Sequence, residues 1–460
     1  MRFGLGAAAV CLLAAAASAV STTGNRLLVV LDELADKENY GRFFADLTKR
    51  GFAITYETPR SEHVKLFDLG ARTYDHLILL PAKMKGETVA LGPNLTPNIL
   101  VDFINANGNI LVTLSSKTPA SSSLTALLAE VDITLPAERT GTVVDHFNYD
   151  AVSAPDAHDV LVLDPPANVR PGLKTYFEVP GPVSFPHGCG HALGPGALLT
   201  PVLRAPSTAY SCNPADQGGV VDPEDLFAAG AQLALVSVFQ ARNSARLAVV
   251  GSAEMLQDKW LDAEVSRPDG PRTKTANREF AKRVSGWTFQ EMGVLRVDGV
   301  EHRLKGDNAT NPEIYRIKTD VSYKIALSEY SWDAWHPFTL PAGDELQLEF
   351  SMLSPFHRLN LKPVAATTGA ATVYGTTFTL PDQHGIFNFK VNYKRPFLTN
   401  IEEKNTVSVR HIAHDEWPRS YVISGAWPWI SGIAATVSGF LGFCAIWMYS
   451  KPVDEKSKTK

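Results

Sequence analysis

The sequence is poor in cysteine and lacks the short motifs that mark many enzymes built on α/β folds. Four of its 460 residues are cysteine. It has no G-x-G-x-x-G segment and no P-loop segment, which excludes the dinucleotide and phosphate sites that these motifs form. The turns after two predicted strands, SSK at 115–117 and GSAE at 251–254, lack the G-x-S-x-G spacing of a nucleophile elbow. We therefore predict no catalytic residues and no cofactor.

The charge balance and the absence of repeats exclude further classes. Lysine and arginine number 43 against 48 aspartate and glutamate, a net charge of −5, which argues against nucleic acid as a partner. No repeat of fixed period is visible, so solenoids and propellers are not expected. Hydrophobic residues make up 45% of the chain, enough for a packed core in two or three domains.

The N-terminus has the pattern of a secretory signal. Met1 and Arg2 precede an apolar run from Gly6 to Ala17, and Ala17-Ser18-Ala19 is a small-x-small cleavage site. The run is too short to span a bilayer. We predict a cleaved signal peptide over residues 1–19.

A second apolar stretch lies near the C-terminus. Residues 430–448 contain no charge and reach about 28 Å as a helix, which matches the hydrocarbon core of a membrane. Tryptophans flank both ends of the stretch, as is typical of membrane interfaces. The pattern predicts a transmembrane helix over 427–450, a type I topology with a lumenal bulk, and a cytosolic tail over 451–460.

The tail suggests where the protein resides. Lys456 and Lys458 stand five and three positions from the end, a spacing that resembles a dilysine signal for retrieval to the endoplasmic reticulum. The alternative is an ordinary basic flank of the membrane helix. We expect an endoplasmic reticulum membrane protein.

The segment PHGCGHALGPG, residues 186–196, raises the question of a metal site or a reactive thiol. Cys11 leaves with the signal peptide and Cys444 lies in the span, which leaves Cys189 and Cys212 as a pair in an oxidising compartment. A disulfide between them closes a loop of about 24 residues and stabilises by about 3 kcal/mol. One cysteine and two histidines are too few ligands for zinc. We predict the disulfide, no metal, and turn or surface positions for His187 and His191.

Residues 20–290 read as an α/β domain. Continuous aliphatic runs, such as RLLVVLD at 26–32, alternate with amphipathic segments, which indicates β-α-β units and a mainly parallel sheet covered by helices on both faces. Strands are predicted at 26–32, 52–57, 76–81, 109–114, 232–240 and 245–250, and helices at 40–50 and 96–107.

Residues 291–411 change to short alternating strands. In IFNFKVNYK, residues 386–394, polar and apolar side chains alternate, as in an antiparallel β-sandwich. Residues 412–426 form a juxtamembrane linker. Strands are predicted at 313–317, 321–327, 346–352, 372–380, 386–394 and 406–410.

Three smaller features concern modification and contacts. Asn308 in NAT is the predicted glycosylation site, since Pro97 follows the other sequon at Asn94. DHFNYD, residues 145–150, either supplies metal or catalytic groups or forms a loop hydrogen-bonded to itself, the commoner case. Small residues at helical spacing in the span predict close helix packing, although such residues are frequent in spans generally. They are Ser431, Ala435, Ser438, Gly439 and Gly442.

Seven segments, in order along the chain, resemble the DDOST/WBP-type subunits of the endoplasmic-reticulum oligosaccharyltransferase, in a fungal-like form. They are LLVVLDE near the start, DHFNYD (145–150), STAYS (207–211), FQARNSARL (239–247), WTFQEMGVLRV (287–297), LQLEFSMLSPFHR (346–358) and GIFNFKVNYKR (385–395).

This resemblance implies a GIFT-type, Rossmann-like α/β domain, a membrane-proximal β domain and one helix packed in a complex. Such a complex transfers a glycan from dolichyl diphosphate to Asn of Asn-X-Ser/Thr. The resemblance implies an accessory subunit beside a catalytic STT-type multispanning subunit, ribophorin/SWP-type and DAD/OST-type subunits. The alternatives are a stand-alone lumenal hydrolase or amidotransferase-like enzyme, and a type I receptor or adhesion protein.

Overall fold

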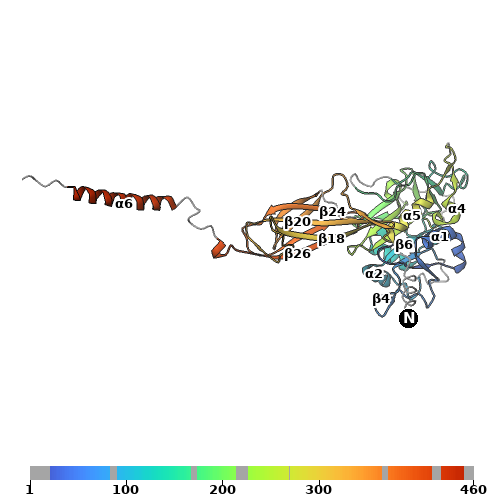
Figure 1. The fold of residues 1–460 in the computed structure, drawn as a ribbon. Helices are drawn as coiled ribbons and strands as arrows, with labels where there is room; N and C mark the ends of the chain where they lie inside the picture. Colours follow the sequence, from blue (N-terminus) through green and yellow to red (C-terminus); the bar gives the residue numbers. More distant parts are fainter. Residues whose placement is uncertain are drawn as a thin grey trace, which may run out of the picture.

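The computed structural model shows two folded bodies and a separate helix (Figure 1). The predicted signal peptide, Lys456 and Lys458 lie outside the described residues. The described residues are 21–82, 91–166, 173–213, 226–268, 270–364, 371–416 and 426–449.

The first body is built on a seven-stranded sheet with the order β12-β14-β15-β6-β5-β1-β2. Neighbouring strands from β2 to β15 run parallel, while β14 and β12 are antiparallel additions at one edge. The strands are β1 (Arg26–Val30), β2 (Ala53–Glu57), β5 (His76–Leu79), β6 (Asn109–Thr113), β12 (Leu199–Arg204), β14 (Ala234–Gln240) and β15 (Arg246–Val250).

Helices cover both faces of this sheet, as predicted. Side chains alternate along a strand, so β1 directs Leu27 and Val29 to one face and Leu28 and Val30 to the other. The first face packs on α1 and α5, and the second on α2 and α3. The helices are α1 (Gly41–Lys49), α2 (Pro97–Asn105), α3 (Ser122–Glu130) and α5 (Asn277–Thr288), of which α3 and α5 were not predicted.

Short elements complete this body. The two-stranded pairs are β3 (Phe67–Asp68) with β4 (Ala71–Arg72), β7 (Ile133–Thr134) with β11 (Ala192–Leu193), β8 (Thr142–Val144) with β13 (Tyr210–Cys212), β9 (Val160–Leu163) with β10 (Val183–Pro186), and β16 (Glu264–Val265) with β17 (Thr273–Lys274). The short helices are η1 (Leu34–Tyr40), η2 (Gly230–Gln232), η3 (Glu254–Leu256) and α4 (Asp258–Leu261).

The second body is one continuous nine-stranded sheet rather than two separate sheets. Its order is β18-β20-β24-β23-β22-β25-β26-β19, and β21 pairs with β20. β23 pairs with β22 along most of its length and with β24 at Lys362 and Pro363, so it carries the sheet around a corner. The sheet folds on itself, and Tyr323 stacks on Phe389 with ring centroids 5.5 Å apart.

The predicted antiparallel sandwich is therefore corrected to a barrel-like sheet, in which β19 and β26 also pair in parallel. The strands are β18 (Met292–Leu304), β19 (Ile314–Arg316), β20 (Asp320–Ser331), β21 (Ala334–Pro337), β22 (Leu346–Ser351), β23 (Pro355–Pro363), β24 (Thr372–Thr379), β25 (Gly385–Tyr393) and β26 (Ile401–Arg410).

The last helix, α6 (Trp427–Met448), lies apart from both bodies (Figure 1). It follows η4 (His414–Glu416). Its 22 residues have a mean hydropathy of 1.7 over the most apolar window, and none of that window is buried. By length and composition α6 is able to cross a membrane, as predicted for this segment.

Candidate functional site: the junction between the two bodies

A buried guanidinium joins the two bodies. Arg246, the first residue of β15, is fully buried. Its Nη atoms donate to the carbonyls of Trp287, Met292 and Gly293, each at 2.7 Å. The guanidinium also lies 4.6 Å from the centroid of the Trp287 ring. Burial lowers the pKa of Arg246 to about 9. Because the three carbonyls belong to the end of α5 and the start of β18, Arg246 fixes the direction in which the second body leaves the first.

The loop after β25 closes the junction from the other side. Trp287 Nε1 donates to the Phe397 carbonyl at 2.9 Å, and Gln240 Nε2 donates to the Leu398 carbonyl at 2.6 Å. The backbone N–H of Asn400 donates to Ser244 Oγ at 3.0 Å. Segments from both bodies that carry the family resemblance, FQARNSARL and WTFQEMGVLRV, thus meet here. Sequence reasoning did not foresee that they share one site.

Two buried carboxyl groups contact cationic side chains at the junction. Arg50 Nη1 lies 2.6 Å from Glu291 Oε2, and Glu291 is fully buried. Burial raises the pKa of Glu291 to about 7 against the attraction of Arg50. Glu329 of β20 lies 2.6 Å from Lys174 Nζ and accepts a hydrogen bond from Tyr176 Oη at 2.8 Å. These carboxylates connect the second body to α1 and to the segment before β10.

A groove of about 290 Å³ lies beside these contacts. It is lined by apolar side chains such as Leu198 and Phe397 and by the cations Arg242 and Arg395. Arg395 is engaged by Asp344, at 2.5 Å. Pockets between domains are common binding sites in proteins, so this groove belongs to the candidate site.

At the carboxyl edge of the parallel sheet, where α/β folds often hold ligands, the PHGCGH segment packs against the turn after β15. The N–H of Cys189 donates to the Gly251 carbonyl directly after β15, at 2.8 Å. His187, at a positive φ of 42°, places Nδ1 2.7 Å from Glu254 Oε2, and Lys117 Nζ lies 2.6 Å from the same carboxylate. Burial opposes ionisation of Glu254, but hydrogen bonds from His187 and Lys117 lower its pKa. The chain's own residues thus occupy the part of this edge that lies beside β15.

The structure does not contain the predicted disulfide between Cys189 and Cys212. Thr142 pairs with Cys189 on one side and with Cys212 on the other. One strand therefore separates the two cysteines, which places their Cα atoms about 10 Å apart. A disulfide requires a Cα separation below about 7 Å. Burial also raises the pKa of Cys189 to about 12, so its thiol is protonated and unreactive.

His191 likewise does not occupy the turn or surface position that was predicted. It is fully buried, and its Nε2 lies 2.6 Å from Ser237 Oγ of β14. Burial lowers the pKa of His191 to about 3, so the ring is neutral. This histidine is part of the core.

The DHFNYD loop is hydrogen-bonded to itself and to STAYS, the commoner of its two interpretations. Asp145 is fully buried and accepts hydrogen bonds from the N–H of Phe147 at 2.8 Å and from Thr208 Oγ1 at 2.9 Å. Asp150 accepts a hydrogen bond from Ser153 Oγ at 2.5 Å. Among the described residues, no group of three or more His, Cys, Asp or Glu side chains is arranged to hold a metal ion.

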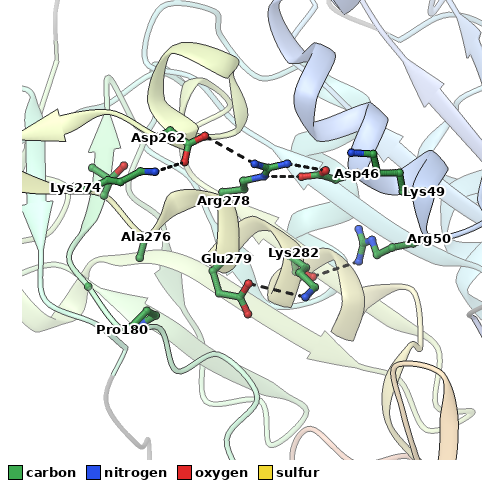
Figure 2. Close-up of a pocket in the computed structure, with 12 residues that line it drawn as sticks. Asp46, Lys49, Arg50, Pro180, Asp262, Lys274, Ala276, Arg278, Glu279 and Lys282 are labelled. Carbon is green, nitrogen blue, oxygen red and sulfur yellow. Dashed lines mark hydrogen bonds and ion pairs between the residues drawn. The ribbon is translucent and has the colours of Figure 1, made fainter.

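A charged cleft of about 640 Å³ lies between α1 and α5 (Figure 2). Arg278 contacts Asp46 at 2.9 Å and Asp262 at 4.0 Å, and Lys274 lies 2.9 Å from Asp262. The hydrogen bond from Arg278 lowers the pKa of Asp46. These contacts connect α5 to α1 across the cleft. The acidic and basic side chains that line the cleft therefore largely neutralise one another.

The predicted packing residues of the span all lie on α6 and are exposed. A Cβ added at Gly439 or Gly442 meets no described atom within 4 Å. The part of the chain that the structure describes therefore supplies no neighbour for this face.

Taken by fold and site, the chain is a mixed α/β protein whose two bodies are locked by buried polar contacts and whose last helix is able to cross a membrane. Comparison with known families is more specific. Residues 18–291 match the family described as OST48, N-terminal domain, and residues 302–451 match the OST48 middle domain. The chain belongs to the OST48 family, which confirms the resemblance found in its segments.

Curated relatives agree in naming and in length. A Schizosaccharomyces pombe protein, dolichyl-diphosphooligosaccharide--protein glycosyltransferase subunit wbp1, is 34% identical over 94% of each chain. Relatives named as the 48 kDa subunit of the same transferase are 30% identical in Arabidopsis thaliana, over 96% of each chain, and 32% identical in Danio rerio, over 94% of this chain and 93% of that one. A solved structure of a β-glucosidase from Listeria innocua in complex with glucose matches with a TM-score of 0.16 and 9% identity. The match covers 86% of this chain and 47% of the glucosidase chain, and it is too weak to carry an argument.

Proposed function

We propose that the chain is an accessory, non-catalytic subunit of the oligosaccharyltransferase complex in the endoplasmic reticulum membrane, needed for assembly and N-linked glycosylation. The observation that carries the proposal is the similarity, over at least 93% of both lengths, to proteins named as subunits of that transferase. The arrangement of the described residues agrees, because the resembling segments build a rigid junction and a self-bonded loop.

The proposed partners are the catalytic STT-type multispanning subunit, which contacts α6, and the ribophorin/SWP-type and DAD/OST-type subunits. Support comes from the exposed small residues of α6, because glycine and serine let helix backbones approach closely in lipid. Gly439→Leu with Gly442→Leu should reduce co-purification of the multispanning subunits. Cys444→Leu enlarges a side chain on the other side of the helix, at about 100° per residue, and should leave recovery unchanged. If the wild type, the double glycine variant and Cys444→Leu all recover the multispanning subunits equally, this helix face is not the contact surface.

The proposed topology is type I. Residues 1–19 are a cleaved signal, 20–290 a lumenal GIFT-type, Rossmann-like domain, 291–411 the membrane-proximal β domain, 412–426 a linker, 427–450 the span and 451–460 a cytosolic tail. The apolarity of α6 supports the span. If Lys456 and Lys458 form a retrieval signal, changing both to serine should let the protein reach later compartments, where its glycan becomes resistant to endoglycosidase H. A glycan that stays sensitive would argue against retrieval.

Asn308 is the proposed site of that glycan. It is exposed, in the turn between β18 and β19. At the other sequon, Thr96 is the N-cap of α2 and its hydroxyl accepts a hydrogen bond from the N–H of Ile99 at 3.4 Å. Asn308→Gln should abolish the mass shift on glycosidase treatment, while Asn94→Gln should preserve it. The reverse pattern would reassign the site.

A further inference from the structure

The second body has one end that faces away from the first body, and the chain leaves for α6 from that end (Figure 1). β26 ends at Arg410, and its last residues pair with the start of β25, with Val409 opposite Gly385. β22 ends beside the same part of β25, with Ser351 opposite Asn388. The turn between β22 and β23, residues 352–354, therefore lies at the end that leads to α6.

This turn presents apolar side chains to the outside. Leu353 is 98% exposed, and nearby Phe356 and Ile386 are 38% and 64% exposed. Met352 lies against the start of β25, because a Cβ added at Gly385 would be 2.9 Å from its Sδ. The Phe356 ring contacts Phe387, with centroids 5.3 Å apart. The turn is thus held on the sheet while Leu353 projects outward.

Two cations with long side chains lie near this end, each beside a carboxylate. Arg358 of β23 is 65% exposed at its side chain and lies 3.4 Å from Glu349. Lys318, in the neighbouring turn, is 59% exposed and pairs with Asp382 at 2.7 Å. Apolar side chains at a tip with basic side chains behind them match the depth profile of a bilayer interface, where cations reach lipid phosphates and apolar groups enter the acyl boundary.

We propose that the 352–356 turn enters the interface of the bilayer that α6 crosses, so that the second body contacts lipid directly. This inference rests on the proposed span. The roughly 16 residues between Arg410 and Trp427 extend to at most about 55 Å, which leaves room for the tip to reach the surface. Lipid fits the tip better than a protein groove, because the apolar surface is a projecting turn of few side chains. With α6 as one attachment and the tip as another, the tilt of both bodies above the membrane is restricted.

The test places an environment-sensitive fluorophore on the full-length chain in phosphatidylcholine nanodiscs. Leu353→Cys carries the label at the tip. Leu69→Cys is the matched control, since Leu69 is 102% exposed in the turn between β3 and β4 of the first body. Both are made in a chain with Cys212→Ser and Cys444→Ser, in which Cys189 is 1% exposed and shielded from label.

The label at position 353 is expected to shift its emission to the blue and to be quenched by nitroxide-labelled lipid, while the label at 69 shows neither effect. Identical behaviour of the two labels would overturn the inference. A blue shift at 353 without lipid quenching, seen only when the other subunits are present, would assign the tip to a protein and also overturn it. A chain labelled at native Cys444, with Cys212→Ser, reports separately whether α6 is inserted, so failure of the tip is distinguishable from failure of the span. Unchanged melting of Leu353→Cys excludes a folding effect.

Discussion

Gly293, at the start of β18, occupies a position in the junction that only glycine fits. Its φ is +67°, and an added Cβ would lie 2.6 Å from the Phe397 carbonyl oxygen and 3.2 Å from Cζ of Tyr176. Its own carbonyl accepts hydrogen bonds from Arg246 at 2.7 Å and from the N–H of Thr399 at 3.0 Å. Gly293→Ala therefore strains the backbone and pushes the closing loop away at the same time.

The expected destabilisation can be summed from these contacts. Holding alanine in the left-handed region costs about 1–2 kcal/mol. Moving the Phe397 carbonyl weakens its hydrogen bond from Trp287, worth about 1 kcal/mol. Together the free energy of unfolding should fall by about 2–3 kcal/mol, which lowers the Tm by roughly 5–10 °C for a body of this size. Gly299→Ala is the matched control in the same strand, because its added Cβ meets nothing within 4 Å; it should change stability by less than about 0.5 kcal/mol.

The assay is thermal unfolding of the full-length chain in detergent, followed by tryptophan fluorescence, with limited proteolysis between the two bodies as a second measurement. Gly293→Ala should melt earlier and be cut faster near residues 290–300 than Gly299→Ala. If the two variants have the same Tm, the loop at Phe397 moves aside without cost. The junction is then not the rigid element described above.

Three further predictions follow from other buried groups. The folded chain retains a proton on Glu291 that the unfolded chain releases between pH 4.5 and about 7, so the free energy of unfolding falls as the pH rises through this window. Because glutamine does not titrate, the free energy of unfolding of Glu291→Gln should rise by about 3 kcal/mol relative to the wild type between pH 4.5 and pH 8. Denaturant titrations measure this difference, and parallel pH curves for the two proteins would contradict it. Asp145→Ala leaves the Phe147 N–H and Thr208 without their acceptor and should destabilise by about 2–4 kcal/mol, seen as early proteolysis within 146–149. When the protein is denatured without reductant, Cys189 and Cys212 should both react with maleimide. If the two cysteines are labelled only after reduction, the disulfide is present after all.

The sequence was most informative where one run of residues makes one buried element. The strands predicted at 109–114 and 245–250 correspond to β6 (Asn109–Thr113) and β15 (Arg246–Val250), because a strand buried on both faces is a continuous aliphatic run. The charge-free stretch near the C-terminus likewise corresponds to α6. By contrast, α5 was not foreseen: its sequence NREFAKRVSGWT begins with charged residues and contains Gly286, which lies against the Trp332 ring.

The candidate site was the least predictable part, because its contacts are long-range. Arg246 reads in the sequence as a charged residue at the start of the strand predicted at 245–250, and its acceptors lie 41, 46 and 47 positions away. Pairing Cys189 with Cys212 by elimination ignored the strand that contains Thr142 and runs between them. His191 was assigned to a turn for its glycine neighbours, yet Ser237 from a distant strand makes it a core residue. In each case the deciding partner lies far away in the sequence.

The buried hydrogen bonds of the junction have a mechanical consequence. An apolar contact between two bodies is stabilised by buried area and tolerates sliding, whereas hydrogen bonds depend on direction and weaken steeply when bent. Arg246 donates to three carbonyls from two consecutive elements, and the loop from Phe397 to Asn400 is held by donors and acceptors of the first body. Rotation of one body against the other would break several of these bonds together. For the assembly role proposed above, a fixed angle between the two bodies is the property that matters, and the buried guanidinium of Arg246 supplies it.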